Sequence, residues 1–198
     1  MAKNMQPVLK RCRTLGISPA VMGYSKNSNR NPGAQRRTKK SEYALQLNEK
    51  QKVKFVYGVL EKQFRAYYEK AAKMPGKTGD NLMSLVERRL DNVVFRLGFA
   101  STRREARQLV NHGHFTVNGK RVDIPSYRVK AGDLVSVAPK AKELLVIKSA
   151  LISNERIQVP AWLEVDIEKL QGSVISLPTR DQIDLDIQEQ LIVELYSK

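Results

Sequence analysis

The chain has 198 residues, a formal net charge of +15 at pH 7 and a sequence pI of about 10.0. Its 41% of hydrophobic residues can form a core, which argues against global disorder. So large a positive surplus favours a polyanionic partner over an ordinary soluble basic protein, because each Lys or Arg that neutralises a phosphate releases a counterion.

The charge is distributed unevenly along the chain. Residues 1–40 contain ten Lys or Arg and no Asp or Glu, whereas residues 149–198 contain four basic and nine acidic residues. This asymmetry predicts one oriented surface that faces a nucleic acid, and an acidic rear that faces solvent or basic neighbours.

The sequence also disfavours membrane-spanning, secreted and disulfide-stabilised proteins. The sequence has no run of about eighteen apolar residues, the length that a membrane span needs, and no apolar signal segment follows Met1. The single Cys12 excludes an internal disulfide framework and fits a reducing compartment. We therefore expect a cytoplasmic protein without a membrane partner.

The first predicted segment, residues 1–40, is rich in Pro and Gly and has no sustained hydrophobic period. Such a basic segment is expected to be extended or disordered alone and to become ordered against RNA.

Two helical patterns follow. Apolar residues recur at three- and four-residue steps between Asn48 and Lys73, and again from Leu82 to Leu97 before Gly98. We interpret both stripes as core-packing faces, because this is the usual role of such spacing. The aromatic side chains in the first stripe are likewise expected in the core rather than stacked on bases.

A short helix and a hairpin come next. Residues 101–112 begin with a capping pattern, Thr102 followed by Glu105, and end before Gly113. The dipeptide Asn118-Gly119 then lies between two alternating segments, which predicts a tight β-hairpin. Further strands are expected at residues 134–137, 163–168 and 173–177, and a helix is expected at residues 187–196.

The capped helix carries the most informative cluster of polar residues. Arg103, Arg104, Arg107 and Gln108 are predicted to share one broad face, opposite Ala106, Leu109 and Val110. Planar guanidinium groups on a rigid helix suit rows of phosphates, and the hairpin adds Lys120 and Arg121 beside Asn118. This arrangement would grip the shape of a folded RNA rather than read a base sequence. An ordinary solvated basic face is the alternative, but few Asp or Glu are interleaved.

Three segments of this region, residues 89–91, 101–110 and 117–120, resemble the αL RNA-binding motif. Residues 48–53, 57–65, 162–166 and 191–198 extend the resemblance to the bacterial family of small-subunit ribosomal protein number four. The likeness covers essentially the whole chain and is weakest over residues 1–30 and 138–158.

The resemblance implies a specific fold and set of partners. Its members bind a multi-helix junction of small-subunit ribosomal RNA early in assembly and help to nucleate it. They contact ribosomal protein number five, at an interface that influences decoding accuracy, and number three is a further expected neighbour. The segment matching Arg36, Arg37, Lys39 and Lys40 would lie near the entrance of the messenger-RNA channel. Some members repress their own messenger.

Metal binding is where the chain departs from many of its bacterial relatives. Those relatives hold zinc with four N-terminal cysteines, whereas this sequence has only Cys12, with His112 and His114 far along the chain. It therefore resembles the zinc-free branch, and we expect neither a metal nor a cofactor nor a small-molecule substrate.

An RNA-modifying enzyme is the rival interpretation. Pseudouridine synthases also combine an αL motif with a catalytic Arg-Leu-Asp, and Asp91 stands in such a triplet. Here Asn92-Val93-Val94 follows, where those enzymes have Thr and Gly, and the stretch has a helical pattern. Asp91 is more simply an ion-pair partner for neighbouring arginines. His112 and His114 indicate acid–base chemistry only weakly, so we expect a binding protein rather than an enzyme.

The sequence thus predicts an α+β protein in three parts. These are an extended basic arm (1–40), an all-helical domain (41–87) closed by the C-terminal tail (177–198), and an αL-type RNA-binding domain with an antiparallel sheet and packed helices (88–176). The predicted RNA-binding residues are Arg36, Arg37, Lys39, Lys40, Arg88, Arg89, Arg96, Arg103, Arg104, Arg107, Gln108, Asn118, Lys120 and Arg121.

Overall fold

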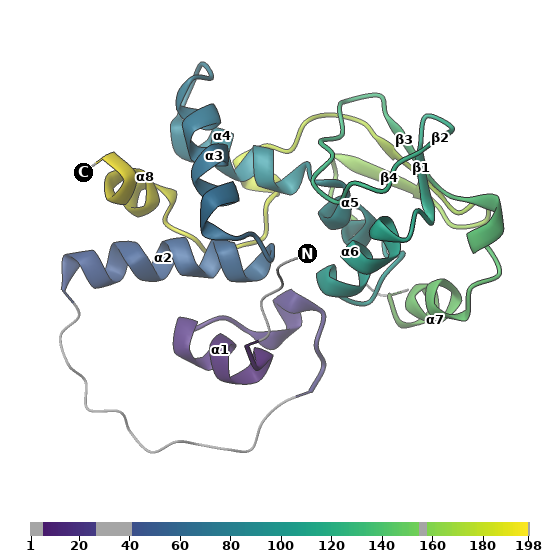
Figure 1. The fold of residues 1–198 in the computed structure, drawn as a ribbon, viewed down its shortest axis with the longest axis horizontal. Helices are drawn as coiled ribbons and strands as arrows, with labels where there is room; N and C mark the ends of the chain where they lie inside the picture. The colour runs from purple at the N-terminus through teal and green to yellow at the C-terminus, as the bar shows by residue number, and fades with distance from the viewer. Residues whose placement is uncertain (1–5, 27–40, 155–157, 198) are drawn as a thin grey trace. The chain divides into compact units, whose positions relative to one another are not determined.

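A computed structural model describes residues 6–26, 41–154 and 158–197 (Figure 1). The chain forms two compact units, the first made of Met1–Asn81 and Leu185–Lys198, the second of Leu82–Asp184. The helices are α1 (Val8–Leu15), α2 (Glu42–Val56), α3 (Glu61–Ala72), α4 (Thr78–Glu87), α5 (Leu90–Arg96), α6 (Arg103–Asn111), α7 (Leu145–Asn154) and α8 (Glu189–Ser197). Short 3₁₀ helices lie at Pro19–Met22, Pro139–Ala141 and Arg180–Gln182.

The strands all belong to the second unit and form one antiparallel sheet. They are β1 (Phe115–Val117), β2 (Lys120–Arg121), β3 (Leu134–Val137), β4 (Leu163–Asp166) and β5 (Gln171–Val174), in the order β2-β1-β3-β5-β4. In the register, Phe115 lies opposite Val137 on β3, and Val135 lies opposite Gly172 on β5. The mixed helix-and-sheet class, the hairpin and the bounds of β3 are therefore as the sequence predicted. Strand β4 ends two residues before the predicted 163–168, and β5 begins two residues before the predicted 173–177 and ends at Val174.

The core of the second unit lies between the sheet and helices α5 and α6. Phe99 and Phe115 are both fully buried, with ring centroids 6.1 Å apart, and Trp162 is also fully buried. Each such side chain contributes about 1.5–3 kcal/mol or more through the apolar surface it removes from water. These contacts fix the helix α6 and the β1–β2 hairpin to one rigid body.

In the first unit, the C-terminal helix α8 packs against α2 and α3. The Tyr196 hydroxyl donates a hydrogen bond to Glu61 at 2.7 Å, and the Tyr196 ring stacks on Tyr68 with centroids 4.7 Å apart. On the same helix, Glu194 accepts a hydrogen bond from the fully buried Gln46 of α2 at 3.2 Å. Segments far apart in sequence are therefore tied together by polar as well as apolar contacts.

Both long helices expected from the sequence are interrupted. The first ends at Val56 in a left-handed turn, where Gly58 has φ +62°, and α3 begins at Glu61. The second is broken between α4 and α5, because the backbone of residues 88–91 is hydrogen-bonded to the backbone of residues 125–129. Hydrophobic spacing continues across both breaks, so the pattern alone did not reveal them.

The N-terminal segment also differs from the expectation of an extended arm. Residues 8–15 form helix α1 and residues 19–22 a 3₁₀ turn, in which Cys12, Leu15 and Met22 are buried. Burial of these three side chains supplies the apolar contacts that order the segment. The prediction of an extended conformation is wrong for these residues, and residues 27–40 lie outside the described part of the chain.

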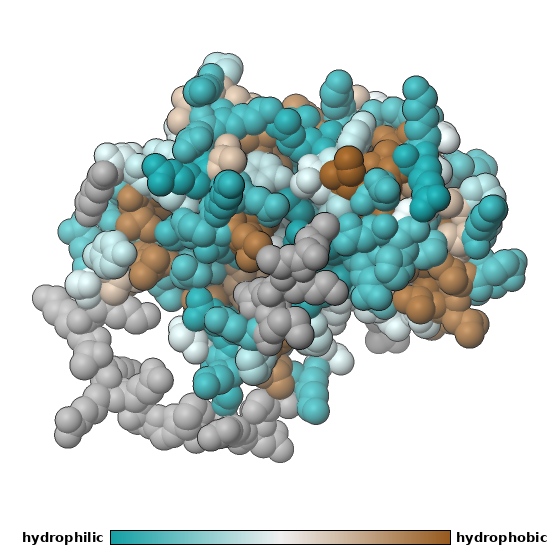
Figure 2. Space-filling view, in the orientation of Figure 1, coloured by the Kyte–Doolittle hydropathy of each residue, from teal (hydrophilic) through white to brown (hydrophobic). Residues whose placement is uncertain are grey.

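Helix α7 was not expected from the sequence. Its apolar residues surround the helix rather than follow one face, so Leu145 is 80% and Ile152 is 76% exposed while Ile147 is fully buried. Figure 2 shows hydrophobic residues gathered over the position of α7. Among the residues that the structure describes, no helix has the length and hydropathy of a membrane span.

Candidate nucleic-acid interface

Helix α6 is held at both ends by local hydrogen bonds. The Thr102 hydroxyl accepts from the Glu105 backbone at 3.2 Å, while the Glu105 carboxylate accepts from the Ser101 backbone at 2.7 Å, one residue before the expected position. At the C-terminus, Gly113 has φ +71°, and the amides of Gly113 and His114 donate to the carbonyls of Val110 and Leu109. This Schellman ending, together with the cap, fixes which side chains the helix presents to solvent.

The four polar residues predicted for one face of α6 do not all lie at the surface. Arg104 and Gln108 are exposed and Arg107 is half-buried, as a binding face requires. Arg103 is only 6% exposed: its Nε donates to the Asn92 side chain at 2.8 Å. The prediction that Arg103 belongs to the exposed face is wrong, because its guanidinium is used inside the fold.

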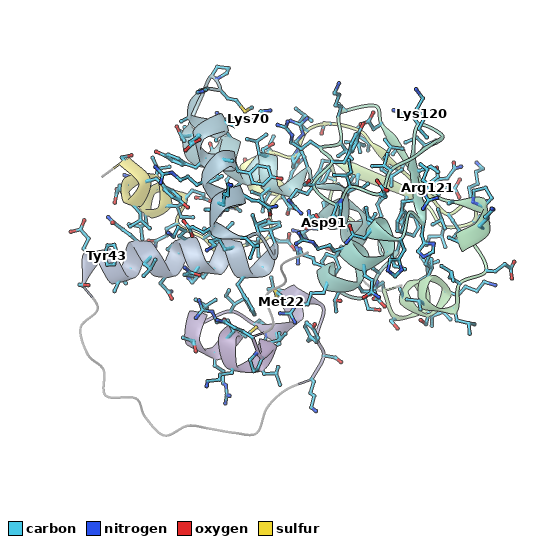
Figure 3. All side chains as sticks on the ribbon, viewed as in Figure 1. Met22, Tyr43, Lys70, Asp91, Lys120 and Arg121 are labelled. Carbon is cyan, nitrogen blue, oxygen red and sulfur yellow. The ribbon has the colours of Figure 1, made fainter. Side chains whose placement is uncertain are left out.

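The β1–β2 hairpin supplies the second group of cations. Asn118 and Gly119 have φ values of +51° and +77°, the conformation of a type I′ turn, as predicted. Lys120 and Arg121 follow the turn and are exposed (Figure 3). Arg121 reaches back to the end of α6, where its Nη2 donates to the His112 carbonyl at 3.3 Å.

Arg121 also lies directly against Gly113. A Cβ atom added to Gly113 would collide with the Arg121 guanidinium. The hairpin and α6 therefore meet at this glycine, which joins their cations into one surface. We call this the α6–hairpin surface and define it as Arg104, Arg107, Gln108, Lys120 and Arg121.

Asn118, predicted to contact RNA, is held instead by residues at the start of β3. Its side-chain amide donates to Asp133 at 2.8 Å and its carbonyl oxygen accepts from the Leu134 backbone at 2.9 Å. Asp133 in turn accepts from the Lys130 backbone at 2.7 Å. Asn118 thus ties the hairpin to β3 and orients the neighbouring cations.

The arginines around Asp91 are mostly internal. Arg89 is 1% exposed and forms a two-pronged ion pair with Asp91, with its Nη2 2.6 Å from a carboxylate oxygen. Asp91, labelled in Figure 3, is 4% exposed. For Arg89, the predicted RNA contact is therefore not supported, because the guanidinium is enclosed, whereas the predicted ion pair with Asp91 is confirmed.

Arg96 and Arg88 are intermediate cases. Arg96 pairs with the fully buried Glu87 at 2.6 Å and with Asp184 at 2.8 Å. Arg88 is half-buried, and its Nε donates to the Val129 carbonyl at 3.0 Å. Burial, and then the charge of Arg128, lowers the pKa of Arg88. Both arginines therefore act first as internal ties of the second unit.

Glu87 and Asn92 connect these pairs into one network. The Asn92 amide donates to Glu87, and the Asn92 carbonyl oxygen accepts from Arg103. Asn92 links the end of α4 to α5 and to the start of α6. The charged interior thus determines how α6 is placed, while the exposed residues next to it remain at the surface.

The remaining predicted residues, Arg36, Arg37, Lys39 and Lys40, lie outside the described residues. Within the described ranges, no group of three or more His, Cys, Asp or Glu could hold a metal ion. His112 and His114 were not among the predicted RNA-binding residues. His112, the first residue after the end of α6, lies four residues after Gln108 and is exposed.

Comparisons with known proteins agree with this architecture. The model of the ribosomal protein S4/S9 N-terminal domain matches residues 3–87, and the S4 domain model matches residues 88–135. Small ribosomal subunit protein uS4 of Agathobacter rectalis is 59% identical to the chain, and its counterpart in Fusobacterium nucleatum is 54% identical, each over the full length of both proteins. The uS4 protein of Clostridioides difficile is 58% identical over 100% of both chains. With full-length relatives at this identity and both family domains in place, the chain belongs to the family of small ribosomal subunit protein uS4.

Proposed function

We propose that the protein is a structural constituent of the small ribosomal subunit that binds ribosomal RNA through the α6–hairpin surface. The observation that carries this proposal is the contact between Arg121 and the end of α6. It places Arg121 and Lys120 beside the helix that presents Arg104 and Arg107. The protein therefore offers several cations on a rigid support rather than on separate flexible loops.

The chemistry of this surface suits folded RNA. Guanidinium groups form paired, charge-assisted hydrogen bonds with phosphate oxygens. The helix and the turn are both fixed by their own hydrogen bonds, so the spacing of the cations is set before RNA binds. A fixed spacing selects RNA by the positions of its phosphates, which is recognition of shape.

Family membership supports further roles. We propose that the protein binds a multi-helix junction of small-subunit ribosomal RNA early in assembly and helps to nucleate it. The protein would then contact ribosomal proteins number five and number three and contribute to decoding accuracy. Arg36, Arg37, Lys39 and Lys40 would face messenger RNA where it enters. These roles place the protein in the cytoplasm, on the ribosome.

The residues also bear on whether the protein binds zinc and whether it is an enzyme. The whole sequence contains one Cys and two His, fewer thiol and imidazole ligands than the four cysteines of zinc-binding relatives, so we assign the protein to the zinc-free branch. The Asp91 carboxylate is occupied by Arg89 and by the Asn92 backbone amide. A catalytic Asp would need access to a flipped-out base, so we propose a binding role and not catalysis.

The direct test is copurification. A tagged copy of the full chain should sediment with small ribosomal subunits and remain bound through a high-salt wash, because shape-matched contacts in the assembled particle add to the charge attraction that salt weakens. An unrelated basic protein of similar charge serves as the control. If both proteins were released at the same moderate salt concentration, the proposal would be contradicted, because the chain would then bind RNA only through its net charge.

A further inference from the structure

A pair of histidines lies at the end of the α6–hairpin surface. The rings of His112 and His114 meet edge to face, with centroids 5.8 Å apart and an interplanar angle of 72°. His112 is exposed and His114 is half-buried.

His112 continues the polar stripe of helix α6. Arg104, Gln108 and His112 follow one another at four-residue steps, and all three are exposed. With a rise of about 1.5 Å per residue, the stripe is about 12 Å long. The His112 carbonyl also accepts the hydrogen bond from Arg121. The histidine pair is therefore continuous with the cations.

The backbone on which the pair stands is fixed. The His114 amide donates to the Leu109 carbonyl at 3.2 Å, and the His114 carbonyl accepts from Ala138 at 2.8 Å. Gly113, between the histidines, is enclosed by the Arg121 side chain. Both histidines thus stand on backbone tied to α6, the hairpin and the end of β3.

The surroundings of His114 favour the uncharged ring. Burial lowers its pKa below the ordinary 6.5, and the nearby charges of His112 and Arg121 lower it further. A neutral imidazole offers one N–H donor and one acceptor nitrogen. A phosphate oxygen can only accept hydrogen bonds, whereas a ribose 2′-hydroxyl both donates and accepts.

We propose that the His112–His114 pair is a ribose-binding part of the RNA interface, which contacts 2′-hydroxyl groups beside the phosphates held by the cations. This inference rests on the proposed function, since it assumes that RNA lies on the α6–hairpin surface. It adds a means of distinguishing RNA from DNA. The cations provide charge, and the histidines provide the contact that only RNA can complete.

The test uses the full chain and a fragment of small-subunit ribosomal RNA that contains the junction. Hydroxyl-radical footprinting first locates the protected riboses, and a second fragment carries 2′-deoxy nucleotides at those positions. Affinities of wild type, H112A/H114A and R104A/R107A are then measured at pH 7.5 over a range of salt. Circular dichroism checks that each variant is folded. If H114A disturbs the half-buried site, H112A alone serves for the same comparison.

We expect H112A/H114A to lose about tenfold in affinity, the scale of one or two neutral hydrogen bonds. The slope of log affinity against log salt should not change, because no phosphate contact is removed. The 2′-deoxy fragment should weaken wild type about tenfold but the histidine variant less than twofold. R104A/R107A should give a shallower salt slope and keep the full 2′-deoxy penalty. H112Q/H114Q should recover part of the affinity, because an amide also has a donor and an acceptor.

Three results would overturn the inference while leaving the proposed function intact. First, H112A/H114A could bind as tightly as wild type. Second, its salt slope could be shallower than that of wild type, which would show that the histidines contact phosphates. Third, the 2′-deoxy fragment could weaken this variant as much as it weakens wild type. Failure of the proposed function is distinguishable, because wild type itself would then bind the junction fragment no better than a scrambled RNA.

Discussion

The guanidinium carbon of Arg103 lies 4.3 Å from the centre of the Phe95 ring, inside the second unit. The next residue, Arg104, is exposed. Two adjacent arginines of one helix therefore have different tasks. Arg103 attaches α6 to α5, and Arg104 faces solvent, where RNA can reach it.

This difference can be measured with two single variants. R103A should lower the free energy of unfolding by about 2–4 kcal/mol, because it removes the contact with Phe95 and leaves the Asn92 oxygen without its donor. R104A should change stability by less than about 0.5 kcal/mol. Urea unfolding of both variants checks this expectation. Equal stability of R103A and wild type would show that the buried contact is not needed for the fold.

The Arg89–Asp91 pair gives a second prediction about stability. D91A removes the carboxylate that pairs with the enclosed Arg89 guanidinium, which should cost about 3–5 kcal/mol. The double variant R89M/D91A removes the stranded charge and should recover most of that loss, since an apolar side chain is tolerated in such a position. Thermal and urea melts of the two variants provide the comparison. If the double variant were as unstable as D91A, the pair would not act through charge burial.

The polar contact between α3 and α8 predicts a pH dependence. Burial alone would raise the pKa of Glu61, but hydrogen bonds from Lys54, Tyr196 and Lys50 together outweigh it and hold the pKa at about 2, below the ordinary 4.5. Because the folded-state pKa is depressed, this stabilisation is present above about pH 4.5 and is lost as the pH falls toward 2. The stability difference between wild type and E61Q, from urea unfolding, should shrink over that interval. Y196F removes only one of the donors to Glu61, so its stability should differ from that of wild type by less than the stability of E61Q does. A stability difference between wild type and E61Q that did not change with pH would exclude this mechanism.

Gly113 should be required for the placement of Arg121. In G113A the new Cβ would collide with the guanidinium and strain a positive φ, so both stability and RNA affinity should fall. G119A is a matched control, because Gly119 has φ +77° but open space around its Cβ position. Both variants should lose about 1 kcal/mol of stability from φ strain, but only G113A should bind RNA as weakly as R121A. If the double variant G113A/R121A lost RNA affinity by the sum of the two single losses, Gly113 would act independently of Arg121.

Local chemistry made parts of this structure predictable. The Asn118-Gly119 turn and the Thr102 cap depend on residues adjacent in sequence, and both were recognised. The burial of Arg103 was partly visible, because it precedes Ala106 by three residues and so borders the apolar side of the helix. Its partners could not be inferred, since Phe95 and Asn92 come from another helix.

Other features depend on tertiary contacts and left no local signal. The break between α4 and α5 is stabilised by hydrogen bonds to residues 125–129, almost forty residues away. Helix α7 lacks a single apolar face, so its period is weak. A cluster of basic residues likewise does not indicate which of them pair internally, and Arg89 and Arg96 were assigned to RNA for that reason.

We propose that the cations of the α6–hairpin surface bind folded ribosomal RNA. The most direct measurement compares wild type with R104A/R107A/K120A/R121A for affinity to the small-subunit junction fragment and to a scrambled RNA of equal length. At near-physiological salt, wild type should prefer the junction at least tenfold, and the variant should lose about a hundredfold with a salt slope shallower by about three. Its circular dichroism spectrum should match wild type, because three of the changed side chains are exposed and the fourth, Arg107, is only half-buried. Equal affinity of wild type for the two RNAs, or an unchanged affinity in the variant, would contradict the claim.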